Sequence, residues 1–107
     1  MNILRVIIGG AGRVGTELAK TLRAEEMDVV LVDSDSRAVK NAQNLDVLVI
    51  HGDLTTREKL HEAGIGEAEV FVAATNSDER NLLACALAEH AHYQYGGSKA
   101  KPLLSIS

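Results

Sequence analysis

Three glycines near the N-terminus have the spacing of a phosphate-binding turn. Gly10, Gly12 and Gly15 stand in the stretch "RVIIGGAGRVG" in the pattern G-x-G-x-x-G. They follow a short apolar run and precede a segment with helical periodicity, which is the context that this pattern requires. The first glycine permits a tight turn, the second lets a phosphate approach the backbone, and the third lets the helix pack on the strand. A tight turn without a ligand is the alternative interpretation.

Arg13 lies within this turn, where the helical segment begins. The amino end of a helix carries partial positive charge, so a cation is poorly placed there unless an anionic ligand occupies that end. We therefore interpret Arg13 as a counter-charge to a pyrophosphate. A plain solvated arginine is the alternative, because dipole effects at a protein surface amount to only about 0.3–1 kcal/mol.

An acidic residue follows the second apolar run, in "VVLVDSD". Asp33 comes roughly 20 positions after the glycines, where dinucleotide-binding proteins place an acid that binds the adenosine ribose. Its charge would repel a 2′-phosphate, which favours NAD over NADP. Arg37 weakens this preference, because an arginine near the acid could bind the 2′-phosphate of NADP. Asp35 is predicted to be a helix cap rather than a second ribose ligand.

Polar residues also follow the third and fourth apolar runs. Asp53 follows the third run, in "HGDLT". We expect Asp53 and Leu54 to lie near an adenine. The alternative is that Asp53 is a turn residue ahead of a helix that Thr55 caps. The stretch "AATNSDERN" carries groups that could face the middle of a dinucleotide, or could equally be caps and first-turn acids: Thr75, Asn76, Asp78 and Glu79.

Alternating apolar and helical segments define the fold that would position these residues. The apolar runs are Leu4–Ile8, Val29–Val32, Val47–Ile50 and Val70–Ala74, and "PLLSIS" begins a fifth. Strands separated by helices predict a parallel sheet with right-handed crossovers. The fold class is therefore α/β, a Rossmann-like doubly wound parallel sheet of five strands in the order 3-2-1-4-5.

Four segments between the strands show helical signals. Val14, Leu18 and Leu22 form a stripe at helical spacing, and a second helix is predicted over 36–44. "TTREKLHEAG" pairs Thr55 with Glu58 as a capping box and closes on Gly64. "NSDERNLLACALAEH" offers Asn76 or Ser77 as cap and a predicted apolar face formed by Leu82, Leu83, Ala86 and Leu87.

Composition narrows the class of protein. The 107 residues predict a single domain, 1–107, and 46% apolar with 24% charged residues is typical of a globular protein. A net charge of −4 gives no sign of the basic surface that binding to nucleic acid requires. Cys85 is predicted to be a core residue of a cytoplasmic protein. No zinc spacing, nucleophile elbow or acid/base pair is present, so no metal and no catalytic residue is expected.

The combined motifs resemble a known family. "IIGGAGRVGTELAKTL", "DVVLVDSD", "LDVLVIHGDLTTREKLHEAGI" and "EAEVFVAATNSDERNLLACALA" follow in the order and spacing of the N-terminal RCK or KTN domain of Trk and Ktr potassium-uptake regulators. The resemblance implies a cytosolic sensor that binds NAD(H), or ATP and ADP in some branches. It implies a homodimer or ring at the inner face of the membrane, joined to a potassium channel or transporter subunit.

The resemblance also implies a set of cofactor-binding residues. Those around the phosphates and ribose are Gly10, Ala11, Gly12, Arg13, Val14, Gly15, Asp33 and Ser34. Those beside the adenine and along the remaining rim are Asp53, Leu54, Thr75, Asn76 and Glu79. The chain departs from the family pattern after "HYQYGGSKAKPLLSIS", where further elements and a ligand domain would follow. A truncated chain and a stand-alone subunit are both consistent with this departure.

The sequence thus predicts a regulatory nucleotide-binding module that controls potassium transport and is not itself an enzyme. The alternative is the cofactor domain of an NAD-dependent oxidoreductase. That alternative needs a substrate domain and a proton donor near the nicotinamide, and the chain has room for neither.

Overall fold

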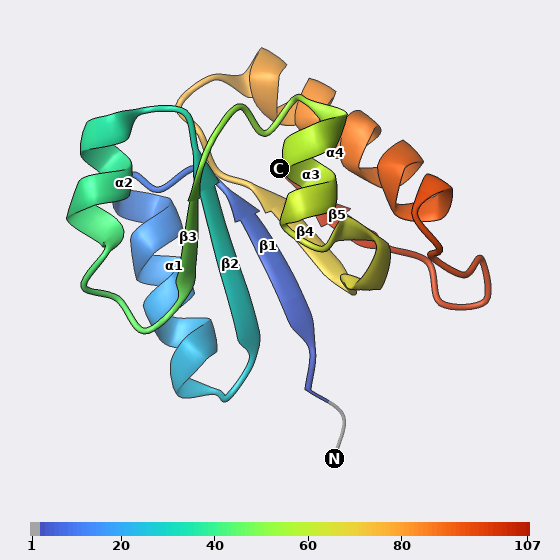
Figure 1. Cartoon of the computed structure of the whole chain (residues 1–107), viewed down its shortest axis with the longest axis horizontal. Coiled ribbons are helices and arrows are strands. Elements are labelled where there is room, and N and C mark those ends of the chain that lie inside the picture. Colours follow the sequence, from blue (N-terminus) through green and yellow to red (C-terminus); the bar gives the residue numbers. More distant parts are fainter. Residues whose placement is uncertain (1–2) are drawn as a thin grey trace.

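Five parallel strands form one sheet at the centre of the computed structural model, which describes residues 3–107. The strands are β1 (Arg5–Gly9), β2 (Asp28–Asp33), β3 (Leu48–His51), β4 (Val70–Ala73) and β5 (Leu104–Ile106). Their order in the sheet is β3-β2-β1-β4-β5 (Figure 1). The predicted fold class, strand order and fifth strand are confirmed.

The central strand β1 is apolar because both of its faces are covered. Ile7 and Ile8 are fully buried, and in the register Ile7 lies between Val30 of β2 and Phe71 of β4. Parallel sheets place helices on both faces, so their inner strands have continuous apolar runs rather than alternating ones. This is why the short runs in the sequence predict the strands to within about two residues.

Four helices and one short 3-10 turn cover the sheet. Helices α1 (Arg13–Ala24) and α2 (Ser36–Ala42) lie on one face. Helices α3 (Arg57–Glu62) and α4 (Asp78–Gln94), with the turn η1 (Ile65–Glu67), lie on the other. Two separate apolar clusters result, one on each side of the sheet.

The predicted apolar face of α4 is wrong. Leu82 and Leu83 are exposed at 66% and 52%, and Ala86 is also exposed. The helix instead buries small residues at helical spacing, namely Ala84, Ala88 and Ala91. Small side chains allow α4 to approach the sheet closely, and hydrophobicity alone does not reveal that preference. Leu87 is half-buried and packs on the core, as does Cys85.

The stripe on α1 needs a smaller correction. Leu18 and Leu22 pack against the sheet as predicted, but Val14 is 68% exposed. The buried positions of α1 are Gly15 and Ala19. Val14 is therefore not part of the stripe that packs on the sheet.

Three of the predicted helix ends are confirmed, and the predicted cap of α3 is wrong. Asp35 caps α2 and Ser77 caps α4, and Gly64 follows α3 with a φ of 88°. The cap of α3 is Thr56, whose hydroxyl accepts the N–H of Lys59, and not the predicted Thr55. Thr55 instead bonds to Asp53, two positions earlier. Thr55 therefore belongs to the turn, and Thr56 caps the helix.

Candidate functional site

The turn after β1 adopts a conformation that depends on glycine. Gly10 has a φ of +122°, and its N–H donates to the carbonyl oxygen of Val32 at 2.8 Å. A Cβ atom at this position would lie 2.8 Å from the carbonyl oxygen of Ala74. The turn therefore passes tightly between the carboxyl ends of β2 and β4, which flank β1 in the sheet.

The other two glycines of the motif have different surroundings. A Cβ atom on Gly15 would overlap the carbonyl oxygen of Gly10, so α1 can pack this closely only without a side chain there. Gly12 has nothing within 4 Å of its Cβ position. The surroundings of Gly12 are open, as expected where a ligand approaches the backbone.

The amino end of α1 differs from the amino ends of the other α-helices in residues 3–107. Gly12 supplies no side-chain cap, and the first turn of α1 carries no acidic residue. Helices α2, α3 and α4 each have a side-chain oxygen that accepts a backbone N–H at this position. The first N–H groups of α1 therefore have no such partner, and Arg13, exposed in the same turn, adds a positive charge.

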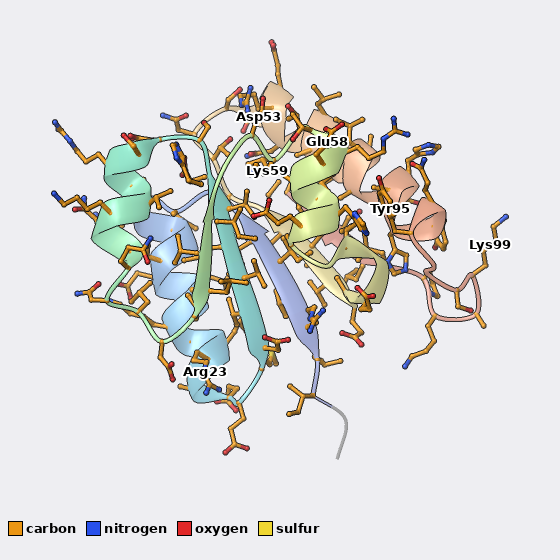
Figure 2. All side chains as sticks on the ribbon, in the orientation of Figure 1. Arg23, Asp53, Glu58, Lys59, Tyr95 and Lys99 are labelled. Atoms are coloured by element: carbon orange, nitrogen blue, oxygen red, sulfur yellow. The ribbon has the colours of Figure 1, made fainter. Side chains whose placement is uncertain are left out.

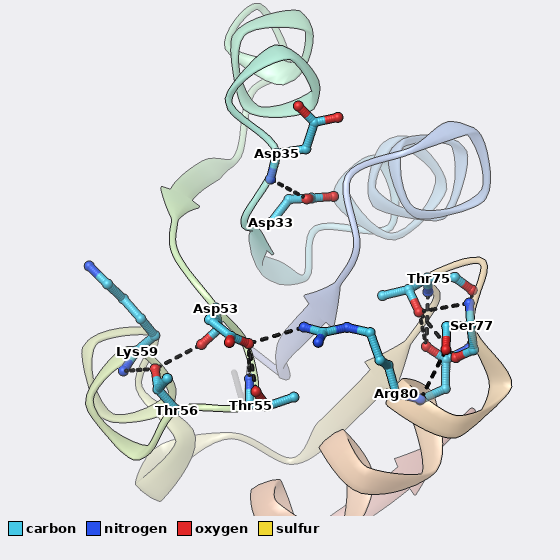
Figure 3. A network of polar contacts seen from close by, with 10 residues as sticks. Asp33, Asp35, Asp53, Thr55, Thr56, Lys59, Thr75, Ser77 and Arg80 are labelled. Atoms are coloured by element: carbon cyan, nitrogen blue, oxygen red, sulfur yellow. Dashed lines mark hydrogen bonds and ion pairs between the residues drawn. The ribbon is translucent and has the colours of Figure 1, made fainter.

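Asp33 ties the end of β2 to the glycine turn. One carboxylate oxygen accepts the N–H of Ala11 at 2.7 Å. The other accepts the N–H of Asp35 at 2.8 Å, a bond drawn in Figure 3. Ala11 is 3% exposed, so its N–H relies on this carboxylate. Each carboxylate oxygen has a further lone pair, so Asp33 can still accept hydrogen bonds from the hydroxyl groups of a ligand.

These elements enclose a cleft of about 530 Å³ at the carboxyl ends of the strands. In open parallel sheets, ligands bind at this edge, where the strand order reverses. The lining combines the glycine turn with the ends of β2 and β4 and with residues from α2, α4 and the segment after β3. It consists of Gly10, Gly12, Arg13, Val14, Asp33, Ser34, Asp35, Ala38, Leu54, Ala74, Thr75, Asn76 and Arg80.

An ion pair crosses from α4 to the segment after β3. Nη2 of Arg80 lies 3.1 Å from Oδ1 of Asp53, and Figure 3 shows the arginine reaching across the space between the two elements. The same Oδ1 accepts the N–H and the hydroxyl of Thr55, at 2.8 and 2.6 Å. The two hydrogen bonds from Thr55, and secondarily the charge of Arg80, lower the pKa of Asp53 below its ordinary value of 3.8.

Asn81 fixes the loop between β4 and α4. It is 7% exposed, its carbonyl oxygen accepts the N–H of Thr75 at 3.1 Å, and its amide donates to the carbonyl oxygen of Thr75 at 3.1 Å. The hydroxyl of Thr75 also bonds to Asn81 and accepts the N–H of Ser77 at 3.2 Å. The polar atoms of this loop are thus held in place before any ligand arrives.

The predicted site residues divide into two groups in the structure. Nine of them line the cleft: Gly10, Gly12, Arg13, Val14, Asp33, Ser34, Leu54, Thr75 and Asn76. The other four, which are Ala11, Gly15, Asp53 and Glu79, do not line it. Ala11 and Gly15 shape the turn, Asp53 holds Arg80, and Glu79 is exposed in the first turn of α4. Their roles toward a nucleotide stay predictions.

Sequence reasoning missed Arg80 and Asn81. The role of Arg80 could not be predicted, because a basic residue in the first turn of a helix, beside acidic residues, is usually an ordinary surface residue. Asn81 had a usable signal, because it is a polar residue at the position that continues the spacing of Ala84, Ala88 and Ala91. An amide on the buried face of a helix needs hydrogen-bond partners, and here the neighbouring loop supplies them.

Other hollows lie outside the cleft. A groove of about 460 Å³ between α1 and α2 adjoins it and contains Lys20 and Arg37, so Arg37 faces this groove rather than the cleft. A hollow of about 630 Å³ lies at the amino ends of the strands, where Arg5 pairs with Asp28 at 2.9 Å. Figure 2 shows Arg23 at that edge and Asp53 at the opposite one. Among residues 3–107, no cluster suited to a metal ion is found.

The fold, with its cleft at the carboxyl ends of the strands, defines the class of protein as a Rossmann-like domain. The model of the TrkA-N domain family matches residues 6–97, and the chain belongs to that family. The resemblance to the N-terminal domain of Trk regulators is thereby confirmed.

Curated relatives carry names from potassium uptake. The chain is 48% identical over 83 residues to a Trk system potassium uptake protein TrkA homolog of Methanothermobacter thermautotrophicus, covering 77% of this chain and 38% of the relative. It is 40% identical over 86 residues to the Trk system potassium uptake protein TrkA of Vibrio alginolyticus, covering 79% of this chain and 19% of that protein. The chain thus spans well under half the length of these relatives.

Solved structures confirm the fold. The TrkA-N domain of the inner membrane protein ybaL from Escherichia coli superposes with a TM-score of 0.68 at 14% identity, covering 99% of this chain and 87% of that one. A UDP-glucose 4-epimerase of Thermus thermophilus in complex with NAD has a TM-score of 0.68 at 20% identity, covering 86% of this chain and 34% of the enzyme. The described part of the chain, residues 3–107, contains no helix long and apolar enough to cross a membrane.

Proposed function

We propose that this chain is a regulatory domain that binds NAD(H) in the cleft and controls potassium transport through a membrane channel or transporter. One observation carries the nucleotide assignment: the open, uncapped amino end of α1 adjoins the fixed carboxylate of Asp33 in a single cleft. A pyrophosphate satisfies the first of these features and an adenosine ribose the second. Membership of the TrkA-N family and the names of the relatives support the regulatory assignment.

The residues of the cleft have distinct roles in this proposal. The N–H groups after Gly12 and the guanidinium of Arg13 bind the phosphates. Asp33 and Ser34 bind the ribose hydroxyls, and the buried side chain of Leu54 supports the adenine. Thr75 and Asn76 belong to the remaining rim, with Glu79 beyond the residues that line the cleft. Asp53, also outside that lining, stands next to Leu54 on the side of the adenine. ATP and ADP share the adenosine and the linked phosphates, so they are the alternative nucleotides for the same residues.

Control of transport requires that the nucleotide favours one arrangement of the assembled protein over another. Such a ligand shifts the equilibrium only by its difference in affinity for the two arrangements, typically about 1–3 kcal/mol. We propose that the arrangements belong to a homodimer or larger ring of this domain, bound to a potassium-transporting membrane subunit at its cytoplasmic face. The names of the relatives as Trk system proteins support this partner.

We infer that the domain acts by binding rather than by catalysis. Its relatives are named as uptake-system proteins and not as enzymes. In addition, the polar side chains around the cleft hold the loops to one another: Asp53 bonds to Thr55, and Thr75 bonds to Asn81. These arrangements fix the shape of a binding site and supply no free acid/base pair.

A thermal unfolding titration tests the nucleotide assignment. A ligand that binds only the folded protein at 100 times its Kd stabilises it by about 2.7 kcal/mol, which raises the melting temperature by several degrees. We expect such a rise with NAD, NADH, ADP or ATP, and a smaller one with NADP at the same concentration. If none of these nucleotides raises the melting temperature, the nucleotide-binding function is wrong.

A further inference from the structure

The ion pair between Arg80 and Asp53 links two segments that are far apart in the sequence. Arg80 lies in the first turn of α4, and Asp53 lies in the segment after β3, 27 positions earlier. Arg80 lines the cleft and Asp53 does not. Arg80 is therefore the residue of the pair that a bound ligand would contact.

Asp53 does not depend on Arg80 to keep its position. Its Oδ1 accepts two hydrogen bonds from Thr55, and its backbone carbonyl accepts the N–H and the hydroxyl of Thr56, at 3.0 and 2.8 Å. By contrast, Nη2 of Arg80 donates to Asp53 alone, and both side chains are about half exposed, at 46% and 45%. Exposed ion pairs of this kind contribute little net stability, so Arg80 can exchange its partner at low cost.

Arg80 and Arg13 approach the cleft from opposite faces of the sheet. Arg13 begins α1, which packs on one face, and Arg80 belongs to α4, which packs on the other. Both residues line the cleft. A planar guanidinium binds phosphate through two parallel hydrogen bonds. Because Oδ1 of Asp53 already accepts two hydrogen bonds from Thr55, a phosphate with free oxygens is a competing partner for Arg80.

We propose that Arg80 binds the second phosphate of the nucleotide, leaving Asp53 when that phosphate arrives. This inference rests on the proposed nucleotide-binding function and adds a residue that determines specificity within it. The first phosphate lies at the glycine turn beside Arg13, and the second lies between that turn and α4. The site therefore distinguishes nucleotides with two linked phosphates, such as ADP and NAD, from those with one, such as AMP.

Calorimetric titration of AMP and ADP into the wild type and the Arg80→Gln variant tests this role. Loss of a charged hydrogen-bond donor to phosphate weakens binding by about tenfold or more, so we expect that loss for ADP and a change of less than about twofold for AMP. Arg57→Gln is the matched control. It removes the same charge from α3, outside the residues that line the cleft, and should leave the ratio of the two affinities unchanged.

The exchange of partners has its own test in the Asp53→Asn variant. Effects of Asp53 on the adenine apply to AMP and ADP alike, so the ratio of the two affinities isolates the phosphate. Removing the competing carboxylate should raise the preference for ADP, and adding Arg80→Gln to this variant should return the ratio to that of Arg80→Gln alone.

The outcomes separate this inference from the function on which it rests. If the wild type binds neither AMP nor ADP nor NAD, both the nucleotide-binding function and the role of Arg80 are wrong. If the wild type binds them and Arg80→Gln weakens AMP and ADP equally or not at all, only the role of Arg80 is overturned. An unchanged ratio in Asp53→Asn, with a changed one in Arg80→Gln, overturns the exchange with Asp53.

Discussion

The carboxylate of Asp33 accepts the N–H of Ala11, and this bond joins the end of β2 to the glycine turn after β1. The two residues are 22 positions apart in the sequence, and the oxygen and nitrogen are 2.7 Å apart. Asp33 therefore holds the proposed phosphate site in place while also facing the proposed ribose site. Substitution of this one residue should change both stability and ligand choice.

Asp33→Ala is expected to lower the free energy of unfolding by about 1–3 kcal/mol, because the buried N–H of Ala11 loses its acceptor. The same variant should lose more affinity for NAD than for NADP, since the repulsion of a 2′-phosphate disappears together with the ribose contact. Urea denaturation measures the first effect and calorimetric titration the second.

Asp46→Ala is the control for this variant, because Asp46 is 89% exposed and pairs with Arg23 at the opposite edge of the sheet. It should unfold close to the wild type and keep the wild-type preference between the two nucleotides. Equal losses for NAD and NADP in Asp33→Ala would show that Asp33 does not contact the ribose.

Alanine at two glycines of the same motif should separate folding from binding. Gly15→Ala places a Cβ atom against the carbonyl oxygen of Gly10, so we expect a loss of several kcal/mol or failure to fold. Gly12→Ala meets nothing within 4 Å and should fold as the wild type does. Gly12→Ala should nevertheless bind NAD at least tenfold more weakly, because the methyl group occupies the space that a phosphate needs.

Circular dichroism melting and NAD titration on the two variants provide the measurement. A Gly12→Ala variant that binds NAD as the wild type does would place the phosphates elsewhere. A Gly15→Ala variant of wild-type stability would mean that α1 can move away from the turn without cost.

The positions of the strands and the glycine turn could be predicted because each depends on local pattern, and the strand order followed from the rule for sheets of this fold class. Buried parallel strands are short continuous apolar runs. The turn between β1 and α1 needs glycine at Gly10 for its positive φ, and at Gly15 because a side chain there would overlap the carbonyl oxygen of Gly10. The position of Asp33 followed from its place at the end of β2. Each of these features follows from residues that are close to it in the sequence.

The buried face of α4 and the partner of Asp53 depend on contacts between distant segments. Leu82 and Leu83 predict an apolar face, but the apolar residues that α4 buries fully are alanines, beginning at Ala84. Arg80 reaches Asp53 only because α3 and α4 lie on the same side of the sheet. No local pattern carries that information, so the sequence alone could not place Arg80 at the cleft.

Asn81→Ala is expected to destabilise the protein by about 1–3 kcal/mol. Asn81 is buried and exchanges hydrogen bonds with both backbone groups of Thr75, and those groups would lose their partner. Asn41→Ala on the exposed face of α2 is the control and should change stability by less than about 0.5 kcal/mol. Urea denaturation compares the two, and equal stability would show that water replaces Asn81 at Thr75.

Asp53 should give the protein an acid-sensitive contribution to stability. Its pKa in the folded state is lowered from 3.8, first by the hydrogen bonds from Thr55 and then by the charge of Arg80. A carboxylate whose pKa is lowered by folding stabilises the folded state at pH values above 3.8, and this contribution is lost as the pH falls through the lower, folded-state value. The wild type should therefore exceed Asp53→Asn in stability at pH 7 and pH 5.

Urea denaturation at pH 7, 5, 4 and 3 measures the difference between the wild type and Asp53→Asn. We expect it to be constant from pH 7 to 5 and to shrink below about pH 4, near the ordinary pKa of the group. Because Thr55 is the larger cause, Thr55→Ala should remove more of this acid-sensitive part than Arg80→Gln does. A difference that grows toward pH 3 would mean that folding raises the pKa of Asp53, and the two bonds from Thr55 would then not stabilise its charged form.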